Sequence, residues 1–146
     1  MSDLDLQVMS RWLELDEGCE LRPYACTANK LTIGIGRNLE DVGITREEAD
    51  FLLKGDMERV QAQLDERFPE WKTLSPVRKM VILNMAFNMG VNGLLQFRKT
   101  IAFIQFQLWE DAANEMLNSK WAEQVGARAR RLSQAMKTDQ LPSAVA

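Results

Sequence analysis

The chain has 146 residues, enough for one domain or for two small lobes that share a core. Its 46% hydrophobic and 27% charged residues are typical of a globular protein, and a chain of this length folds without a metal or a disulfide. The formal net charge of -3 gives no support to nucleic-acid binding or to a polybasic membrane anchor. Histidine is absent, which excludes Ser-His-Asp and Cys-His catalysis and most catalytic zinc sites. Proton transfer near neutral pH then falls to a carboxylate, a lysine, a tyrosine or a thiol, and carboxylates are the most plentiful of these groups.

The first elements follow from spacing and capping. Apolar residues at helical spacing predict a helix over 4–15, with Asp3 as its cap and Gly18 after its end. Short β-like pieces follow over 18–40, of which 31–35 is the clearest. Thr45 and Glu48 have the spacing of a capping box, and an apolar stripe continues from there to residue 64. The chain therefore changes from helix to sheet and back within its first half.

The second half reads as helical throughout. Ser75-Pro76 opens a helix that is apolar nearly all round, so we expect it to be the buried centre of the fold, ended by Gly90 and Gly93. The asparagines and glycines that interrupt the apolar segment over about 80–95 also argue against a membrane span. Further helices are predicted over 101–106, 109–117 and 127–136. The fold class is thus α+β, mainly α, with a sheet-containing lobe over about 16–66, a helical lobe over about 75–137 and a flexible tail over 138–146.

One group of residues near the predicted sheet has catalytic potential. Glu17 stands where the chain leaves the first helix, and the period-two rule puts Thr32, Gly34 and Gly36 on one strand face, with Ile33 and Ile35 packed inward. That face would carry a hydroxyl beside two bare backbone positions, with room for a bulky ligand. An acid and a second group that places water are what glycoside hydrolysis needs. The alternatives are a solvated glutamate at a helix end and a Gly-Ile-Gly bend with no ligand.

Longer motifs carry a resemblance over about residues 6–136. They are Glu17-Gly18, Leu21-Arg22-Pro23-Tyr24, Leu31-Thr32-Ile33-Gly34-Ile35-Gly36, Asn84-Met85-Ala86-Phe87-Asn88-Met89-Gly90, Trp109-Glu110-Asp111-Ala112-Ala113, Ser119-Lys120-Trp121 and Arg128-Ala129-Arg130-Arg131. The chain resembles the phage-type lysozymes and endolysins of glycoside hydrolase family twenty-four. The pattern of that family is Glu, eight residues, Asp or sometimes Cys, five residues, Thr, and Glu17, Cys26 and Thr32 match it.

The resemblance implies roles for individual residues. Glu17 would be the general acid, Thr32 would position water and Cys26 would occupy the second catalytic position. Phe87 and Thr100 fall where relatives contact the glycan, and Asn38 and Glu115 correspond more weakly because their residue types differ.

Three further positions would support the acid or the fold around it. Arg128 matches a cleft arginine that pairs with the catalytic glutamate and stabilises its carboxylate. Arg37 stands where many relatives carry a histidine, and the resemblance implies that it pairs with Asp56. Such a pair would lack the pH switch of histidine, because a guanidinium stays charged.

Cys26 departs from the aspartate that most relatives carry. A free thiol has a pKa of about 8.5, so at neutral pH only a small fraction of it is thiolate. Either the site lowers the pKa of this thiol, or Cys26 is a weaker base than aspartate would be. The alternative is a buried structural thiol.

Some residues have less specific interpretations. Trp12, Trp71, Trp109 and Trp121 could stack on sugars, but three of the four lie on helical stripes and read as core. A basic cluster could bind anionic cell-wall polymers or outer-membrane phosphate groups, or be a solvated helix face; it comprises Arg128, Arg130, Arg131 and Lys137. The rival functions are a nucleic-acid-binding helical module, which the acidic charge opposes, and a cell-wall binder without catalysis.

The resemblance implies a monomeric muramidase that acts on peptidoglycan glycan strands and lyses a host bacterium. We expect no cofactor and no metal, no nucleic acid and no membrane span. With only Cys19 and Cys26, and with an acidic N-terminus that does not look like a signal peptide, synthesis in the host cytoplasm with reduced thiols is expected. A holin would then release the protein to the cell wall in the periplasm.

Overall fold

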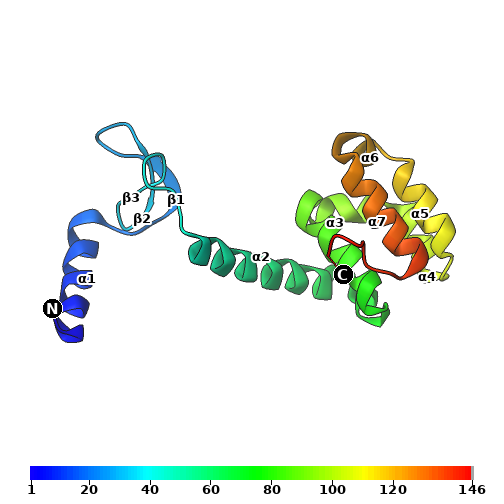
Figure 1. The fold of residues 1–146 in the computed structure, drawn as a ribbon, viewed down its shortest axis with the longest axis horizontal. Coiled ribbons are helices and arrows are strands. Elements are labelled where there is room, and N and C mark those ends of the chain that lie inside the picture. The colour runs from blue at the N-terminus through cyan, green and yellow to red at the C-terminus, as the bar shows by residue number, and fades with distance from the viewer. Residues whose placement is uncertain (146) are drawn as a thin grey trace. The chain divides into compact units, whose positions relative to one another are not determined.

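The computed structural model describes residues 1–145, and its α-helices and strands are labelled in Figure 1. The end of the predicted tail, Ala146, lies outside these residues. In chain order the elements are α1 (Asp3–Glu17), β1 (Glu20–Ala25), β2 (Leu31–Gly34), β3 (Arg37–Asn38), α2 (Arg46–Arg67), the 3-10 helix η1 (Pro69–Thr73), α3 (Pro76–Leu95), α4 (Arg98–Gln105), α5 (Trp109–Leu117), α6 (Lys120–Val125) and α7 (Ala127–Thr138). The predicted α+β class, mainly helical with one small sheet, is confirmed.

The chain forms two compact units, Met1–Phe51 and a second that begins at Leu52. The boundary lies inside α2, whereas the sequence placed the end of the first lobe near residue 66. The difference arises because α2 is one continuous helix, so its apolar stripe gives no sign of where one unit ends. All three strands belong to the first unit.

In the first unit, the N-cap of α1 lies one residue earlier than predicted. Ser2, not Asp3, is the N-cap: its hydroxyl accepts from the amide of Asp5 at 3.1 Å, and the Asp5 carboxylate accepts from the amide of Ser2 at 3.1 Å. This reciprocal pair is a capping box, and it makes Asp3 the first helical residue. Gly18 follows the end of the helix as predicted and is its C-cap, but the helix runs to Glu17 instead of ending at residue 15.

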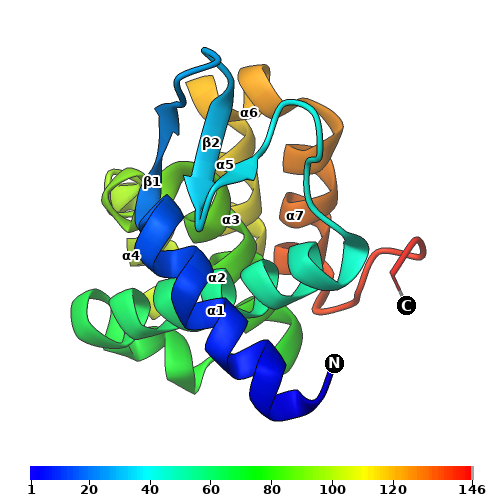
Figure 2. The ribbon, with the colours of Figure 1, turned by 90° about the vertical axis from the view of Figure 1, so that its left-hand side faces the viewer.

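The sheet of the first unit is a three-stranded antiparallel meander in the order β1-β2-β3. Tyr24 lies opposite Thr32 in the first pair, and Thr32 lies opposite Asn38 in the second. The β1–β2 hairpin and the short return to β3 are visible in Figure 2. Thr32 is thus at the centre of the sheet, flanked by both neighbouring strands.

The capping box predicted at Thr45 is confirmed. The Thr45 hydroxyl accepts from the amide of Glu48 at 3.1 Å, and the Glu48 carboxylate accepts from the amide of Thr45 at 3.0 Å. Along the predicted apolar stripe of α2, only Val60 and Leu64 are buried. Both belong to the core of the second unit.

The second unit is built around α3, as the sequence predicted. Ser75 caps α3, and the buried residues of this helix are Arg78, Val81, Ile82, Met85, Ala86, Val91 and Leu94. Gly90 adopts a non-helical φ of 79° and ψ of 157°, but the chain then resumes helical turns to Leu95. Gly90 therefore kinks α3 instead of ending it, and Gly93 lies within its last turn.

No helix within residues 1–145 has by itself both the length and the apolar character of a membrane span. The successive helices α3 and α4 meet that test of length and composition only as a pair, and they are bent by 101°.

The tryptophans of the second unit lie in its core or pack against it. Trp71 and Trp121 are buried, and their indole N–H groups donate to Asp65 at 2.9 Å and to Asn88 at 2.8 Å. Trp109 carries the guanidinium of Arg78 over its ring, 3.9 Å from the centroid. Trp12, in the first unit, is 60% exposed and does not have the core position that its helical stripe predicts.

Arg78 joins the start of α3 to the end of α7. Its Nε donates to the carbonyl of Met136 at 2.8 Å and its Nη2 donates to that of Lys137 at 3.2 Å. Its Nη1 lies 3.6 Å from the carboxylate of Asp139, which also accepts from the Ser75 hydroxyl at 2.5 Å. A guanidinium suits this place because its five donors satisfy carbonyls at the helix end and a carboxylate together.

Substitution of Arg78 by Met should lower the free energy of unfolding by about 2–4 kcal/mol, because buried acceptors lose their charged donor. Urea denaturation followed by circular dichroism measures this change. Arg130→Met is the matched control, since the side chain of Arg130 is exposed and makes no ion pair or hydrogen bond within residues 1–145. Its effect should stay within about 0.5 kcal/mol. Equal stability of the two variants would contradict the anchoring role of Arg78.

Candidate active site

Glu17 is the last residue of α1, whereas the sequence placed it just past the end of a helix over 4–15. The chain leaves the helix at Gly18, whose φ of 73° lies in the region that favours glycine. The amide of Gly18 donates to the carbonyl of Glu14 at 2.8 Å and closes the last turn. Glu17 is therefore fixed at a defined helix end, directly before β1.

The side chain of Glu17 lies against the backbone of Gly36. A β-carbon built on Gly36 would be 2.7 Å from Oε2 of Glu17 and 2.9 Å from its Cδ. The sequence predicted instead that Gly34 and Gly36 would clear one strand face for a ligand. That prediction is wrong for Gly36, because β2 ends at Gly34 and both glycines turn with φ values of 69° and 67°. The strand alternation stops there, and Ile35 is 46% exposed instead of packed inward.

Cys26 begins the tight turn between β1 and β2. Its amide donates to the carbonyl of Lys30 at 3.0 Å, and its carbonyl accepts from the amide of Asn29 at 2.8 Å. Asn29 has a φ of 58°, which asparagine tolerates better than most residues. The thiol is free and half-buried.

The turn also surrounds this thiol with hydrogen-bond donors. The backbone N–H of Lys30, above all, then that of Ala28 and the hydroxyl of Thr32, lower the pKa of Cys26 below its ordinary value. Burial opposes the effect but does not cancel it. Donors directed at sulfur stabilise the anion, so the thiolate fraction near neutral pH is larger than in a free cysteine.

Thr32 is 3% exposed, whereas the sequence predicted a hydroxyl on an open face. Its strand is paired on both edges, and its Oγ1 donates to the carbonyl of Lys30 at 2.8 Å. A threonine hydroxyl has one proton, so donation to this carbonyl and donation to the sulfur of Cys26 are alternatives. The same residue therefore orders the turn and contacts the thiol.

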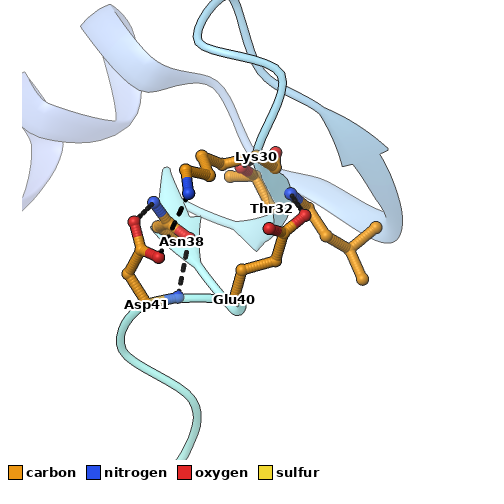
Figure 3. A network of polar contacts seen from close by, with 6 residues as sticks. Lys30, Thr32, Asn38, Glu40 and Asp41 are labelled. Atoms are coloured by element: carbon orange, nitrogen blue, oxygen red, sulfur yellow. Dashed lines mark hydrogen bonds and ion pairs between the residues drawn. The ribbon is translucent and has the colours of Figure 1, made fainter.

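Asn38 takes part in a polar network beside Thr32, drawn in Figure 3. Its amide nitrogen donates to the Asp41 carboxylate at 3.0 Å, and its amide oxygen accepts from the Asp41 backbone at 3.1 Å. Lys30 pairs with the same carboxylate at 3.4 Å, while Glu40 accepts from the amide of Leu31 at 2.8 Å. Asn38, expected to contact substrate, thus holds the turn after β3 with both ends of its amide.

Arg37 and Asp56 each have a partner other than the one expected. Two nitrogens of Arg37 contact the two carboxylate oxygens of Glu48 at 2.9 Å each, and one also donates to the carbonyl of Gly43 at 3.2 Å. Glu48 reaches Arg37 because its capping box with Thr45 holds the carboxylate at the start of α2. Asp56 pairs with Arg59, one helical turn away, at 3.1 Å. The Thr45 backbone bond and then Arg37 hold the pKa of Glu48 below its ordinary value.

In the second unit, two of the predicted substrate residues share one pocket. Thr100, at the start of α4, and Glu115, on α5, line a pocket of about 360 Å³ together with Gln96, Phe97, Arg98, Lys99, Asn118 and Ser119. Thr100 is 1% exposed, and its hydroxyl has no hydrogen-bond partner among residues 1–145. Phe87, on α3, is 42% exposed and is not among the residues that line this pocket.

Arg128, on α7, is bound to α3 within the second unit. Its Nε and Nη2 donate to the side-chain oxygen of Asn84 at 3.0 and 2.8 Å. Both residues line a pocket of about 470 Å³ that the apolar residues Val81, Leu132 and Leu141 also line. The partner Asn84 opens a motif that carries the family resemblance, and no local pattern in the sequence indicates its hydrogen bonds with Arg128.

Two further features of the site have weaker signals in the sequence. The spacing of Thr45 and Glu48 predicts only the start of a helix. A carboxylate in a capping box can also accept a hydrogen bond from a nearby guanidinium. The contact of Gly36 with Glu17 has no local signal, because the two residues meet only through the fold. Among residues 1–145, no three His, Cys, Asp or Glu side chains are grouped so that they could hold a metal ion.

Comparison with known proteins agrees with this arrangement. Residues 14–137 match the family described as phage lysozyme. Probable T4-type lysozyme 1 of Dictyostelium discoideum is 33% identical over 88% of this chain and 93% of its own length, and probable T4-type lysozyme 2 is 27% identical over the same shares. The pre-baseplate central spike protein Gp5 of Enterobacteria phage T4 is 29% identical over 92% of this chain but only 28% of its own length.

The match covers most of the chain, and it includes Glu17, Cys26 and Thr32 and the hairpin that holds the last two. The chain therefore belongs to the phage lysozyme family and is a glycoside hydrolase of the lysozyme type.

Proposed function

We propose that this lysozyme hydrolyses the β-1,4 bond between N-acetylmuramic acid and N-acetylglucosamine in peptidoglycan, with inversion and with Cys26 as the second catalytic group. The observation that carries the proposal is the set of donors around the Cys26 thiol, which lower its pKa where the family usually has a carboxylate. Glu17, Cys26 and Thr32 also belong to the same compact unit, Met1–Phe51.

The proposed reaction needs one proton donor and one proton acceptor. The Glu17 carboxyl gives its proton to the leaving glycosidic oxygen as the C–O bond breaks. The Cys26 thiolate accepts a proton from water as the water oxygen bonds to the anomeric carbon on the opposite face. Thr32 orients that water or the thiolate through its single hydroxyl proton. An inverting enzyme leaves room for this water, with about 6.5–9.5 Å between the two catalytic groups.

The glycan contacts belong to the same proposal. Thr100 and Glu115 are supported as substrate residues because they line one pocket and the Thr100 hydroxyl is buried without a partner within residues 1–145. A buried hydroxyl that lacks a partner is costly, and a bound polar group would relieve that cost. Phe87 is proposed as an apolar surface for a sugar ring because it is 42% exposed. Asn38 retains only its unused lone pair and second amide proton for such a contact.

The biological setting is proposed on the family resemblance alone. The protein would act as an endolysin that waits in the host cytoplasm, needs a holin for release, and lyses the host from the periplasm as a monomer. A cell-wall binder without activity is the rival function, and Cys26 is the only feature that favours it. The donors around Cys26 weigh against that rival, because they make the thiol a better base.

Glu17→Gln should reduce lysis of permeabilised Gram-negative cells by about 10²–10⁴-fold, because the amide has no proton to give to the leaving oxygen. Glu14→Gln makes the same chemical change one turn earlier in α1 and should lyse cells at the wild-type rate. Binding of Glu17→Gln to purified sacculi, measured by sedimentation, should persist. More than about a tenth of wild-type activity in Glu17→Gln would reject Glu17 as the acid.

Cys26→Ala should lose most activity, because no base remains at the second position. Cys26→Asp should stay active, because it restores the residue that the family usually carries there. Cys19→Ser controls for the loss of a thiol in the same segment and should have little effect. The variants are compared by their initial lysis rates at equal protein concentration. If Cys26→Ala lyses cells at the wild-type rate, Cys26 has no catalytic role and only packs.

The first products should carry the α-anomeric configuration, because water attacks on the face opposite to the broken β-bond. Proton NMR of a fresh digest, recorded before the sugar mutarotates, resolves the two anomers. The initial appearance of the β-anomer would contradict the inverting mechanism and indicate a covalent glycosyl-enzyme.

A further inference from the structure

We propose that Gly36 is a positioning residue for catalysis: the absence of a side chain at this position sets where the Glu17 carboxylate lies. The inference rests on the proposed role of Glu17 as the acid. It concerns a contact inside the unit Met1–Phe51 and involves no other part of the chain.

The contact is specific to the reactive end of Glu17. A β-carbon on Gly36 would lie 2.7 Å from Oε2, 2.9 Å from Cδ and 3.1 Å from Cγ of Glu17. These are the three nearest atoms, and all belong to Glu17. Two of the distances are below 3.0 Å, a separation that real β-carbons essentially never show. An alanine at position 36 would therefore displace the carboxyl group.

Backbone conformation alone does not explain a glycine here. Gly18, Gly34, Gly36 and Gly43 have φ values of 73°, 69°, 67° and 66°, so a side chain at any of them is strained. Around Gly18, Gly34 and Gly43, however, an added β-carbon would meet nothing within 4 Å. Gly36 combines the same strain with a collision, and the collision is with the proposed acid.

The two effects of an alanine should appear in different measurements. The end of a glutamate side chain is flexible, so it moves aside at little cost in stability beyond the backbone strain. Its position matters for catalysis, because a misplacement of about 1 Å can cost on the order of 10²-fold in rate. Gly36→Ala should therefore reduce kcat by roughly 10–100-fold and leave KM unchanged, since the substrate contacts are intact.

Gly43→Ala is the matched control. It introduces the same side chain at nearly the same φ with no neighbour within 4 Å, and Gly43 has no proposed contact with substrate. The two variants should have similar melting temperatures, while only Gly36→Ala loses kcat. Equal kcat values for Gly36→Ala and Gly43→Ala would overturn the proposal.

Combination with Glu17→Asp tests whether the two residues act together. The shorter carboxylate avoids the new methyl group, so Glu17→Asp should reduce kcat far less in the Gly36→Ala background than in the wild type. In the Gly43→Ala background, Glu17→Asp should reduce kcat by the same factor as in the wild type, as expected for independent sites. If Gly36→Ala does not fold while Gly43→Ala does, the double variant Glu17→Asp/Gly36→Ala should recover folding, and failure to recover would also overturn the proposal.

Glu17→Gln, measured alongside, separates this inference from the proposed function. Wild-type activity in Glu17→Gln would reject the acid itself. If Glu17→Gln is inactive but Gly36→Ala and Glu17→Asp have independent effects on kcat, only the positioning role of Gly36 is rejected.

Discussion

The tight antiparallel pairing of β1 with β2 is the constraint on which the candidate site depends. The turn closes through the hydrogen bonds between Cys26 and Lys30 and between Asn29 and Cys26, and it directs backbone amides at the Cys26 sulfur. The register sets Thr32 opposite Tyr24, two residues before Cys26, so the hydroxyl and the thiol meet. A shift of the register by one residue would turn Thr32 to the other face of the sheet and remove its contact with the thiol.

This geometry explains how a thiol can stand where relatives of the family have a carboxylate. A carboxylate needs no help to be ionised at neutral pH, whereas a thiol does. The turn supplies that help from backbone N–H groups, which do not depend on the side chains of the loop. Thr32 adds a donor that it shares with the Lys30 carbonyl, so in the proposed reaction its hydroxyl would turn to the sulfur when the thiol is ionised.

Much of the fold follows from local patterns in the sequence. The capping box at Thr45 and Glu48, the cap at Ser75 and the apolar character of α3 each depend on residues close in the chain, and the structure agrees with all three. The predictions that differ from the structure depend on contacts across the chain. Strand alternation predicts an open face at Gly36, because it cannot reveal that β2 ends at Gly34. The resemblance implies a pair of Arg37 with Asp56, whereas in the structure Arg37 pairs with Glu48, whose carboxylate the capping box holds at the start of α2.

The state of the Cys26 thiol tests the account most directly. In a Cys19→Ser background, the ultraviolet absorbance of the thiolate can be followed against pH, with Cys19→Ser/Cys26→Ser as the blank. Because the pKa is lowered, the midpoint should lie below about 8.5, the value of a free cysteine, and lysis should fall as the pH drops through that same midpoint. A midpoint at or above about 8.5, or full activity on the acidic side of the midpoint, would contradict a catalytic thiolate.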